Sequence, residues 1–403
     1  MNKDKAALGM FIILLVSYVI NAMDRQLFSV LAPDVRSALG LSLPQVGLAA
    51  TVFTLGMGVA GIPTGYLLGK MSRRAVTIIG LIIFSAATYL TAYAKGMPDL
   101  LLYRFVSGLG EAMQLTALLA IGTTYFLRHR ALAASSLNFT FGIGAIIGPN
   151  LGAAILGATQ WQMPFMVFGL MGAVVLVLIM LFVKPWFTET QVSEQDAGMV
   201  REDGLADTIW ARTPMTLALA TAFAGLAIYG YLGLYPTFLR DALGFTPKEA
   251  GLAVSFYGFG ALLSLFGGWL GDKYDYRKLL IVSLIISAAS GGILFAGLGK
   301  SLALHIVFSF VFGAAISGMV YSNLSAGIIK SVKRRNASYA SGLFVASLYI
   351  PAAFAGYLLG VLKEDFGWSA AGIAQVAGCA LISAVLAWIA AVGQRQPVPH
   401  PQA

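Results

Sequence analysis

Long apolar runs recur along the whole chain and are separated, with one exception, by short polar turns. A helix that crosses a bilayer needs roughly 20 mainly apolar residues. Runs of about that length occur near 8–31, 46–68, 75–94, 100–126, 131–158, 163–183, 215–239, 252–270, 279–298, 302–329, 337–362 and 370–392. The pattern predicts an all-α membrane protein with 12 transmembrane helices.

The exception is a polar stretch at 184–213, between the sixth and seventh runs. It predicts an N-terminal six-helix bundle at 1–183, a linker at 184–213 and a C-terminal six-helix bundle at 214–403. The halves resemble each other, since GLSLPQVGLAATVF begins at Gly40 and GFTPKEAGLAVSFY begins at Gly244. An internal repeat of six spans is typical of secondary transporters.

Composition and charge agree with a membrane protein. The chain is 58% hydrophobic and 11% charged, whereas soluble domains carry about 25% charged residues. Of the 26 Lys and Arg residues, eighteen fall in turns on the side of the N-terminus and six on the other, and Arg25 and Arg104 lie within runs. By the positive-inside rule both termini are cytoplasmic. The bias also accounts for the net charge of +9, so no nucleic-acid partner is expected.

Four ionisable side chains lie deep within runs: Asp24, Arg25, Arg104 and Glu111. Each would cost about 2.5 to 3.5 kcal/mol if it faced lipid unpaired. We therefore expect them to face the bundle interior. Arg104 and Glu111 are seven residues apart, which is two helical turns and hence one helix face. The pattern predicts that Asp24 and Arg25 pack opposite them. Asn21, one turn from Asp24, is a further candidate for the substrate-binding site.

Two interpretations of these charges compete. They could be salt bridges that only hold the first run against the fourth. Apolar packing often replaces such pairs without loss of stability, whereas carboxylates at membrane depth recur in proton relays. We therefore predict that Asp24 and Glu111 carry protons and that Arg25 and Arg104 bind an anionic substrate, because a guanidinium fork suits carboxylate or phosphate.

Other chemistry has little support in the sequence. No phosphate-binding loop of the G-x-x-x-x-G-K-[ST] kind and no cluster of metal ligands occurs, so no cofactor, no metal and no enzymatic activity are expected. His305, near the end of the tenth run, is interpreted as an interfacial residue rather than a proton carrier. The second half has no charge deep within a run and can offer only polar or aromatic groups.

Several motifs resemble the major facilitator superfamily over essentially the whole chain. GYLLGKMSRR and its second copy GWLGDKYDYRK resemble the G-x-L-x-D-R-x-G-R-R signature, with Gly69 in place of the first aspartate. YRFVSGLGEA in the fourth run and GIGAIIGPNLG in the fifth also match family elements. The resemblance implies a cytoplasmic latch made by Lys70, Arg73, Arg74, Asp272 and Arg277.

The resemblance also bears on function. D-R in the first run and R-x-x-x-G-x-G-E-A in the fourth are similar to the anion:cation symporter branch, with the spinster-like branch as a rival. The superfamily lines its cavity with runs one, four, seven and ten, which implies substrate contacts at Tyr229 and Ser317. The prediction is a proton-coupled symporter of a small organic anion of the carboxylate class.

A proton antiporter that exports drugs or amphiphilic lipids is the alternative, because the element in the fifth run is associated with antiport. A non-transporting receptor is a third possibility. The expected partners are a small organic anion, protons and the lipid bilayer, and the expected location is the cell (inner) membrane, as a multi-pass monomer.

Overall fold

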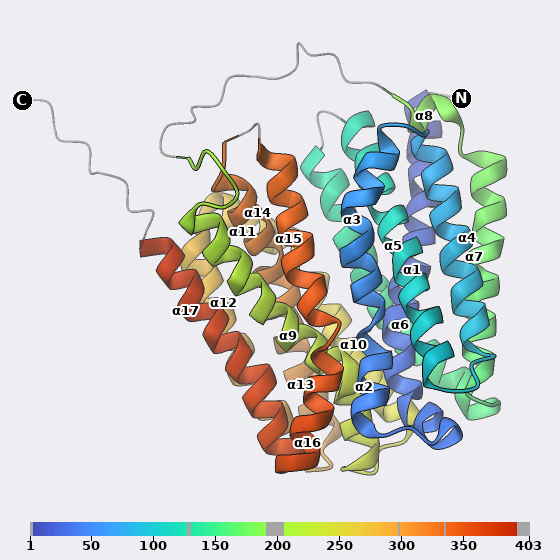
Figure 1. Cartoon of the computed structure of the whole chain (residues 1–403), viewed down its shortest axis with the longest axis vertical. Coiled ribbons are helices and arrows are strands. Elements are labelled where there is room, and N and C mark those ends of the chain that lie inside the picture. The colour runs from blue at the N-terminus through green and yellow to red at the C-terminus, as the bar shows by residue number, and fades with distance from the viewer. Residues whose placement is uncertain (1–2, 127–129, 191–204, 297–298, 334–335, 393–403) are drawn as a thin grey trace, which may run out of the picture.

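The structure is a computed structural model that describes residues 3–126, 130–190, 205–296, 299–333 and 336–392. Helices make up nearly all of the regular structure in these ranges, and a single β-bridge joins Ala206 to Val332. Figure 1 shows two groups of helices side by side, α1 to α7 in one and α9 to α17 in the other.

The first group contains α1 (Lys3–Leu39), α2 (Leu43–Thr51), α3 (Phe53–Leu68), α4 (Arg73–Thr91), α5 (Met97–Tyr125), α6 (Arg130–Ala158), α7 (Gln162–Phe182) and the short α8 (Pro185–Thr188). The second contains α9 (Arg212–Asp241), α10 (Pro247–Ala261), α11 (Ser264–Lys273), α12 (Tyr276–Phe295), α13 (Leu302–Gly313), the π-helix η3 (Ala314–Val320), α14 (Tyr321–Lys330), α15 (Ala337–Ala352), α16 (Ala355–Gly372), η5 (Ile373–Ala377) and α17 (Gly378–Val392).

The internal repeat is visible as repeated capping geometry. Ser42 caps α2 and accepts a hydrogen bond from the Gln45 N–H, while the Gln45 side chain accepts from the Ser42 N–H. Thr246 and Glu249 form the same capping box at the start of α10. In both copies the glycine two residues before the cap has a positive φ, 63° and 71°, which costs glycine little. The related sequences therefore begin related helices.

Three of the predicted runs are not continuous α-helices, although each still forms one segment that is long and apolar enough to cross a membrane. The run at 46–68 divides at Val52 into α2 and α3, and the run at 252–270 divides into α10 and α11. The run at 302–329 passes from α13 through η3 into α14. At Val52 the backbone (φ −61°, ψ −23°) has the values of a 3₁₀ turn. Apolar periodicity could not reveal these breaks, because apolar residues continue through them.

The described residues contain eleven helical segments long and apolar enough to cross a membrane, so the predicted count of twelve is not confirmed. The last segment, Tyr339–Val392, has 54 residues and includes both of the last two predicted runs. α16 continues past the predicted end at residue 362 and contains non-helical backbone at Gly367 (φ 79°, ψ 169°).

The two groups pack against each other most extensively where α6 meets α10, α2 meets α16, α3 meets α15 and α1 meets α9. The second pair is especially close at Gly47 and Gly356. A Cβ built on Gly47 would lie 2.1 Å from the Gly356 carbonyl oxygen, and one on Gly356 would lie 2.0 Å from that of Gly47. Only glycine allows the backbones of these two helices to touch.

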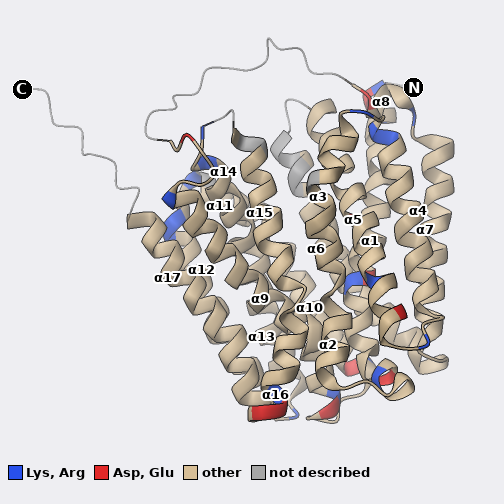
Figure 2. Ribbon diagram, viewed as in Figure 1, with Lys and Arg blue, Asp and Glu red and all other residues tan. Residues whose placement is uncertain are grey.

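Charged positions gather mainly at the two ends of the bundle (Figure 2), and a small group lies at mid-depth in the first half. At the end that carries α8, Phe187 and Thr188 are fully buried. The predicted linker at 184–213 thus starts as packed structure, and α9 begins at Arg212. Residues 191–204 of that linker lie outside the described ranges.

Candidate functional site

The site is built where α1 crosses α5, and α6 fixes the position of α1. Gly144 and Gly148 of α6 face the α1 backbone, where a Cβ on Gly148 would lie 2.5 Å from the Met23 carbonyl oxygen. A Cβ on Gly152 would lie 2.4 Å from the side chain of Leu27. These small residues let α6 lie directly against the turn of α1 that carries Asp24 and Arg25.

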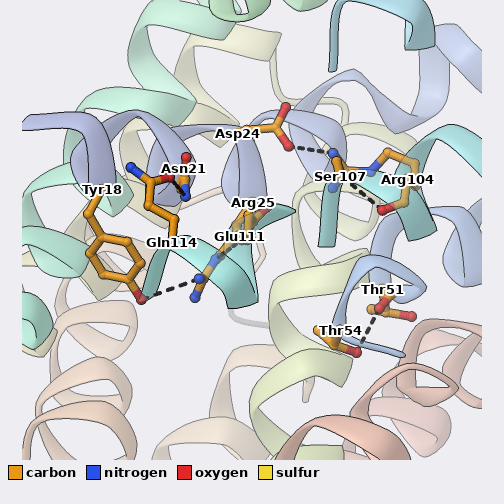
Figure 3. A network of polar contacts seen from close by, with 10 residues as sticks. All are labelled: Tyr18, Asn21, Asp24, Arg25, Thr51, Thr54, Arg104, Ser107, Glu111 and Gln114. Carbon is orange, nitrogen blue, oxygen red and sulfur yellow. Dashed lines mark hydrogen bonds and ion pairs between the residues drawn. The ribbon is translucent and has the colours of Figure 1, made fainter. Parts of the chain in front are cut away.

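Two ion pairs cross between α1 and α5 (Figure 3). Arg25 Nε lies 2.6 Å from Glu111 Oε2, and Arg104 Nη1 lies 2.6 Å from Asp24 Oδ2. All four side chains are buried, Arg25 at 3% exposure and the others at 0%. The predicted packing of the four charges is confirmed. Burial of this kind is tolerable because each charge has an opposite partner.

Uncharged polar groups continue the network along α1 and α5 (Figure 3). Asn21 Nδ2 donates to Gln114 Oε1 at 2.6 Å, and Gln114 in turn donates to Ser17 Oγ. Arg25 Nη2 donates to the Tyr18 hydroxyl at 3.3 Å. The sequence analysis named Asn21 but did not find Gln114, Ser17 or Tyr18. The available signal was their helical spacing, since Gln114 follows Glu111 by three residues and so shares its face.

The two arginines have different surroundings. The Arg25 guanidinium lies 5.5 Å from the centre of the Tyr18 ring and 5.6 Å from that of Phe141. The Arg104 guanidinium lies 5.4 Å from the Phe28 ring and 5.1 Å from the Phe53 ring. Aromatic faces attract a cation within about 6 Å. Each arginine is therefore held by one carboxylate and two rings.

The network keeps spare hydrogen-bonding capacity. Among the described residues, no hydrogen-bond partner is found for the buried Asp24 Oδ1, Glu111 Oε1 and Asn21 Oδ1, or for Arg104 Nε and Nη2. An unmade buried hydrogen bond costs about 1 to 3 kcal/mol. Such groups gain when a ligand or proton supplies a partner. The four charged residues Asp24, Arg25, Arg104 and Glu111, called the tetrad below, are therefore suited to binding and exchange.

A cavity lies next to these four charges and is shared by both halves. Its walls are Tyr18, Arg25, Asn138, Phe141, Ile228, Tyr229, Tyr257, Ala261, Ser264, Ser317, Tyr321, Leu348 and Tyr349. Three predicted site residues, Arg25, Tyr229 and Ser317, thus line one space. The other four, Asn21, Asp24, Arg104 and Glu111, are packed behind the wall. Arg25 alone belongs to both the cavity and an ion pair.

The second half contributes aromatic and hydroxyl groups, as expected. The Tyr229 ring packs against Phe53 and Tyr349, with ring centres 6.0 and 6.2 Å apart. Ser317 belongs to the π-helix η3, and its hydroxyl hydrogen-bonds with that of Tyr257. A single π-helical segment inside an α-helix is often found at a functional site.

A further row of hydroxyl groups runs behind this wall and was not predicted. The Tyr231 hydroxyl donates to Ser309 Oγ at 2.8 Å, and the Tyr235 hydroxyl lies 2.7 Å from His305 Nδ1. His305 lies in the first turn of α13 and is fully buried. Its interpretation as a residue at the membrane interface stays a prediction.

The proposed latch residues make contacts mostly within their own half. The Arg73 and Arg74 N–H groups donate to the Glu189 carboxylate at 3.0 and 3.1 Å. Arg74 Nε donates to the Val183 carbonyl at 2.9 Å, and Lys70 lies over the Tyr66 ring at 4.5 Å.

In the second copy of the motif, the Arg277 N–H donates to Asp275 at 3.1 Å. The Asp272 side chain lies outside what the structure describes. A latch role for these residues stays a prediction.

Two more ion pairs join the halves at the end opposite α8. Arg240 Nη1 lies 2.5 Å from Asp34 Oδ2 and donates to the Val30 carbonyl at 2.7 Å. Arg36 Nη1 lies 3.3 Å from Asp241 Oδ2. Each pair joins the end of α1 to the end of α9, with the acid and base exchanged. Within the described ranges, no cluster of three or more potential metal ligands occurs.

A bundle of membrane-length helices in two groups, with ion pairs buried beside a shared cavity, defines a secondary transporter. The chain belongs to the Major Facilitator Superfamily, whose family model matches residues 14–212 and 217–403. It is therefore a multi-pass membrane transporter and not an enzyme, as predicted.

Known proteins of two kinds are similar to this chain. The probable L-galactonate transporter of Escherichia coli is 26% identical over 97% of this chain and 90% of its own length. The multidrug resistance protein MdtL of Klebsiella pneumoniae is 26% identical over 74% of this chain and 78% of its own length.

Among solved structures, a bacterial homologue of the human lysosomal transporter Spinster has a TM-score of 0.74. It is 19% identical, and the match covers 96% of both chains. At this identity the likeness supports the fold alone.

Proposed function

We propose that the chain is a proton-coupled symporter that takes up a small organic anion of the carboxylate class by alternating access. The proposal rests on Arg25, which lines the cavity and is also part of a buried ion pair. Its Nε lies 2.6 Å from Glu111 Oε2. The similarity to a galactonate transporter supports an organic anion as substrate.

Coupling follows from competition for Arg25. Protonation of Glu111 removes the charge that holds the guanidinium. A buried arginine left without its partner is unfavourable by several kcal/mol, so a substrate carboxylate that enters the cavity takes the place of Glu111. The loaded site then contains protonated Glu111, the positive charge of Arg25 and the negative charge of the substrate, so its net charge is zero. Neutrality favours closure, because a closed cavity is dry and charges are costly in it.

The second pair extends the same chemistry. In our proposal Asp24 is a further proton carrier, and Arg104 and Asn21 are further substrate ligands. Because Arg104 is packed behind the cavity wall, it becomes available only after its pair with Asp24 opens. Tyr229 and Ser317 would contact the substrate from the second half.

The proposal places the protein in the inner membrane of a cell as a monomer, with both termini in the cytoplasm and the two bundles at 1–183 and 214–403. The 54-residue segment Tyr339–Val392 would be about 80 Å long as one helix at 1.5 Å per residue, more than twice the thickness of a bilayer core. We therefore propose that it crosses twice and turns near Gly367, which gives twelve spans. The latch would lie on the cytoplasmic side.

Transport into liposomes tests coupling. With purified protein and an acidic exterior, wild-type protein accumulates a labelled carboxylate against its gradient. Glu111→Gln should accumulate at least tenfold less substrate, because the amide cannot release a proton. It should still exchange substrate across a membrane with no pH difference. Glu364→Gln makes the same change at an exposed position and serves as the control. Uphill accumulation by Glu111→Gln would overturn the role of Glu111.

Export by proton antiport is the second candidate, supported by the similarity to MdtL and by the Gly148–Pro149 element of α6. The two modes differ in direction. If protons that flow inward drive a preloaded substrate out of vesicles instead of concentrating it inside, antiport is correct and symport is excluded.

A further inference from the structure

We propose that the anion is a monocarboxylate with a flat, apolar body, such as an aromatic ring, rather than a polyhydroxylated sugar acid. This inference rests on the proposed function, since it assumes that Arg25 binds the carboxylate, and it goes beyond that function by naming the class of substrate.

The first argument is the charge of the cavity. Arg25 is the one charged side chain among the described residues of the wall. Arg104 is fully buried against Asp24, and the salt bridge leaves that pair neutral. A single guanidinium that exchanges Glu111 for a ligand balances one negative charge. A dianion would bring a second charge that finds a cation only if the pair of Arg104 with Asp24 also opens, and until then a buried unpaired charge is costly.

The second argument is the shape and chemistry of the walls. Six rings line the cavity, those of Tyr18, Phe141, Tyr229, Tyr257, Tyr321 and Tyr349. They come from both halves, and the Tyr229 and Tyr349 rings meet edge to face at 66°. Aromatic pairs in such arrangements gain about 0.5 to 1.5 kcal/mol beyond burial. A planar ring of the substrate would enter between surfaces already arranged to pack on it.

The third argument is the kind of hydrogen-bonding group in the walls. A sugar acid presents several hydroxyl groups, each of which needs a partner once water is excluded. No carboxylate lines the described wall, and Asn138 is the one amide. The other polar groups are the hydroxyl groups of tyrosines and serines, and those of Ser317 and Tyr257 already bond to each other. Neutral hydroxyl groups are weaker acceptors than carboxylates, so this wall favours a ring over a body with several hydroxyl groups.

Ser264 offers a further polar contact in the wall of the cavity. Ser264 begins α11 and lines the wall, and its buried Oγ has no hydrogen-bond partner among the described residues. Arg25 and Ser264 come from opposite halves of the chain. A ligand with a carboxylate at one end and at most one polar substituent at the other would satisfy both, and it would also bring the halves together.

The test is a competition between two probes on the full-length protein in liposomes. We expect unlabelled benzoate to inhibit uptake of labelled benzoate at concentrations at least tenfold below those at which D-gluconate inhibits it. Tyr229→Leu should weaken benzoate binding about fivefold to tenfold, the loss expected for one aromatic contact. Tyr229→Phe keeps the ring and should weaken benzoate binding clearly less than Tyr229→Leu does. Tyr357→Leu, at an exposed tyrosine, is the control for the substitution itself.

The outcomes separate this inference from the proposed function. If D-gluconate is transported in an Arg25-dependent way and benzoate is not, the flat-body inference is wrong and carboxylate transport stands. If Tyr229→Phe loses as much benzoate binding as Tyr229→Leu, the hydroxyl and not the ring is recognised, which also overturns the inference. If Arg25→Gln changes transport of neither probe, the proposed function itself fails.

Discussion

Asp24 and Arg25 are neighbours in the chain, but they do not neutralise each other. Successive residues of an α-helix point about 100° apart, so each side chain meets a different partner on α5. Asp24 pairs with Arg104, and Arg25 pairs with Glu111. Only the second pair reaches the cavity. The two pairs can therefore have different roles although their chemistry is the same.

The pair that is packed behind the cavity wall can be tested for a purely structural role. Asp24→Asn leaves Arg104 buried without a counter-charge and should lower the free energy of unfolding by about 3 to 5 kcal/mol. The double variant Asp24→Leu with Arg104→Met removes both charges and should regain most of that stability. Denaturant titration of the purified protein measures both.

Transport by the double variant then decides between the two roles. We expect it to be stable and inactive, because it can neither carry a proton nor bind an anion at this position. If the double variant transports as fast as wild type, the pair only holds α1 to α5 and the role proposed for Asp24 is wrong.

The sequence revealed the charged residues of the site better than its neutral ones. Charges inside apolar runs stand out, and the seven-residue spacing of Arg104 and Glu111 predicted which face they share. Gln114 and Tyr18 complete the same network, but a single glutamine or tyrosine in a membrane helix has many ordinary explanations. Only the three-dimensional contact separates them from the rest.

At the scale of helices, small residues decide how closely α6 approaches α1. Gly148 faces the Met23 backbone, whereas Gly157, further along the same helix, has no atom within 4 Å of a built Cβ. One helix thus provides both a close-packed glycine and an open one.

Alanine at these two positions should have different effects. Gly148→Ala forces α1 and α6 apart and should lower stability by about 1 to 3 kcal/mol, as overpacking does. Gly157→Ala should be neutral or slightly stabilising, because alanine favours helix. Thermal unfolding of both variants in the same detergent measures the difference. Equal losses would show that the contact between α6 and α1 does not limit stability.

Helix positions were predicted well and helix interruptions were not. The apolar runs follow from composition alone, so their places along the chain agree with the helices. The π-helix η3 and the breaks between α2 and α3 and between α10 and α11 change hydrogen bonding without changing polarity. A hydropathy pattern does not depend on backbone hydrogen bonding. The sequence therefore could not predict that Ser317 lies in a π-helix.

For the whole molecule, the ion pairs between α1 and α9 hold one end of the two halves together. Asp34 with Arg240 and Arg36 with Asp241 are partly exposed, so each contributes about 1 kcal/mol or less. If the halves rock during transport, these contacts must break when that end opens. Their modest strength suits a contact that is made and broken in every cycle.

Reversal of one pair tests this. Arg240→Asp places two acids together and should shift the population toward states open at this end by about fivefold or more, the equivalent of 1 kcal/mol. Adding Asp34→Arg restores the attraction and should reverse the shift. Spin labels on Ser37→Cys and Lys248→Cys, both at exposed positions, report the distance between the ends. An unchanged distance distribution in Arg240→Asp would exclude a gating role for the pair.

The long separation of the tetrad partners in the chain matters before the protein is complete. Asp24 and Arg104 are 80 residues apart, and Arg25 and Glu111 are 86 apart. At a synthesis rate of 5 to 20 residues per second, α1 leaves the ribosome roughly 4 to 17 seconds before α5 can neutralise it. During that interval α1 carries an acid and a base that each cost about 2.5 to 3.5 kcal/mol in lipid. Contact with α5 removes that cost, so insertion of the first helix is expected to depend on the arrival of the fourth predicted span.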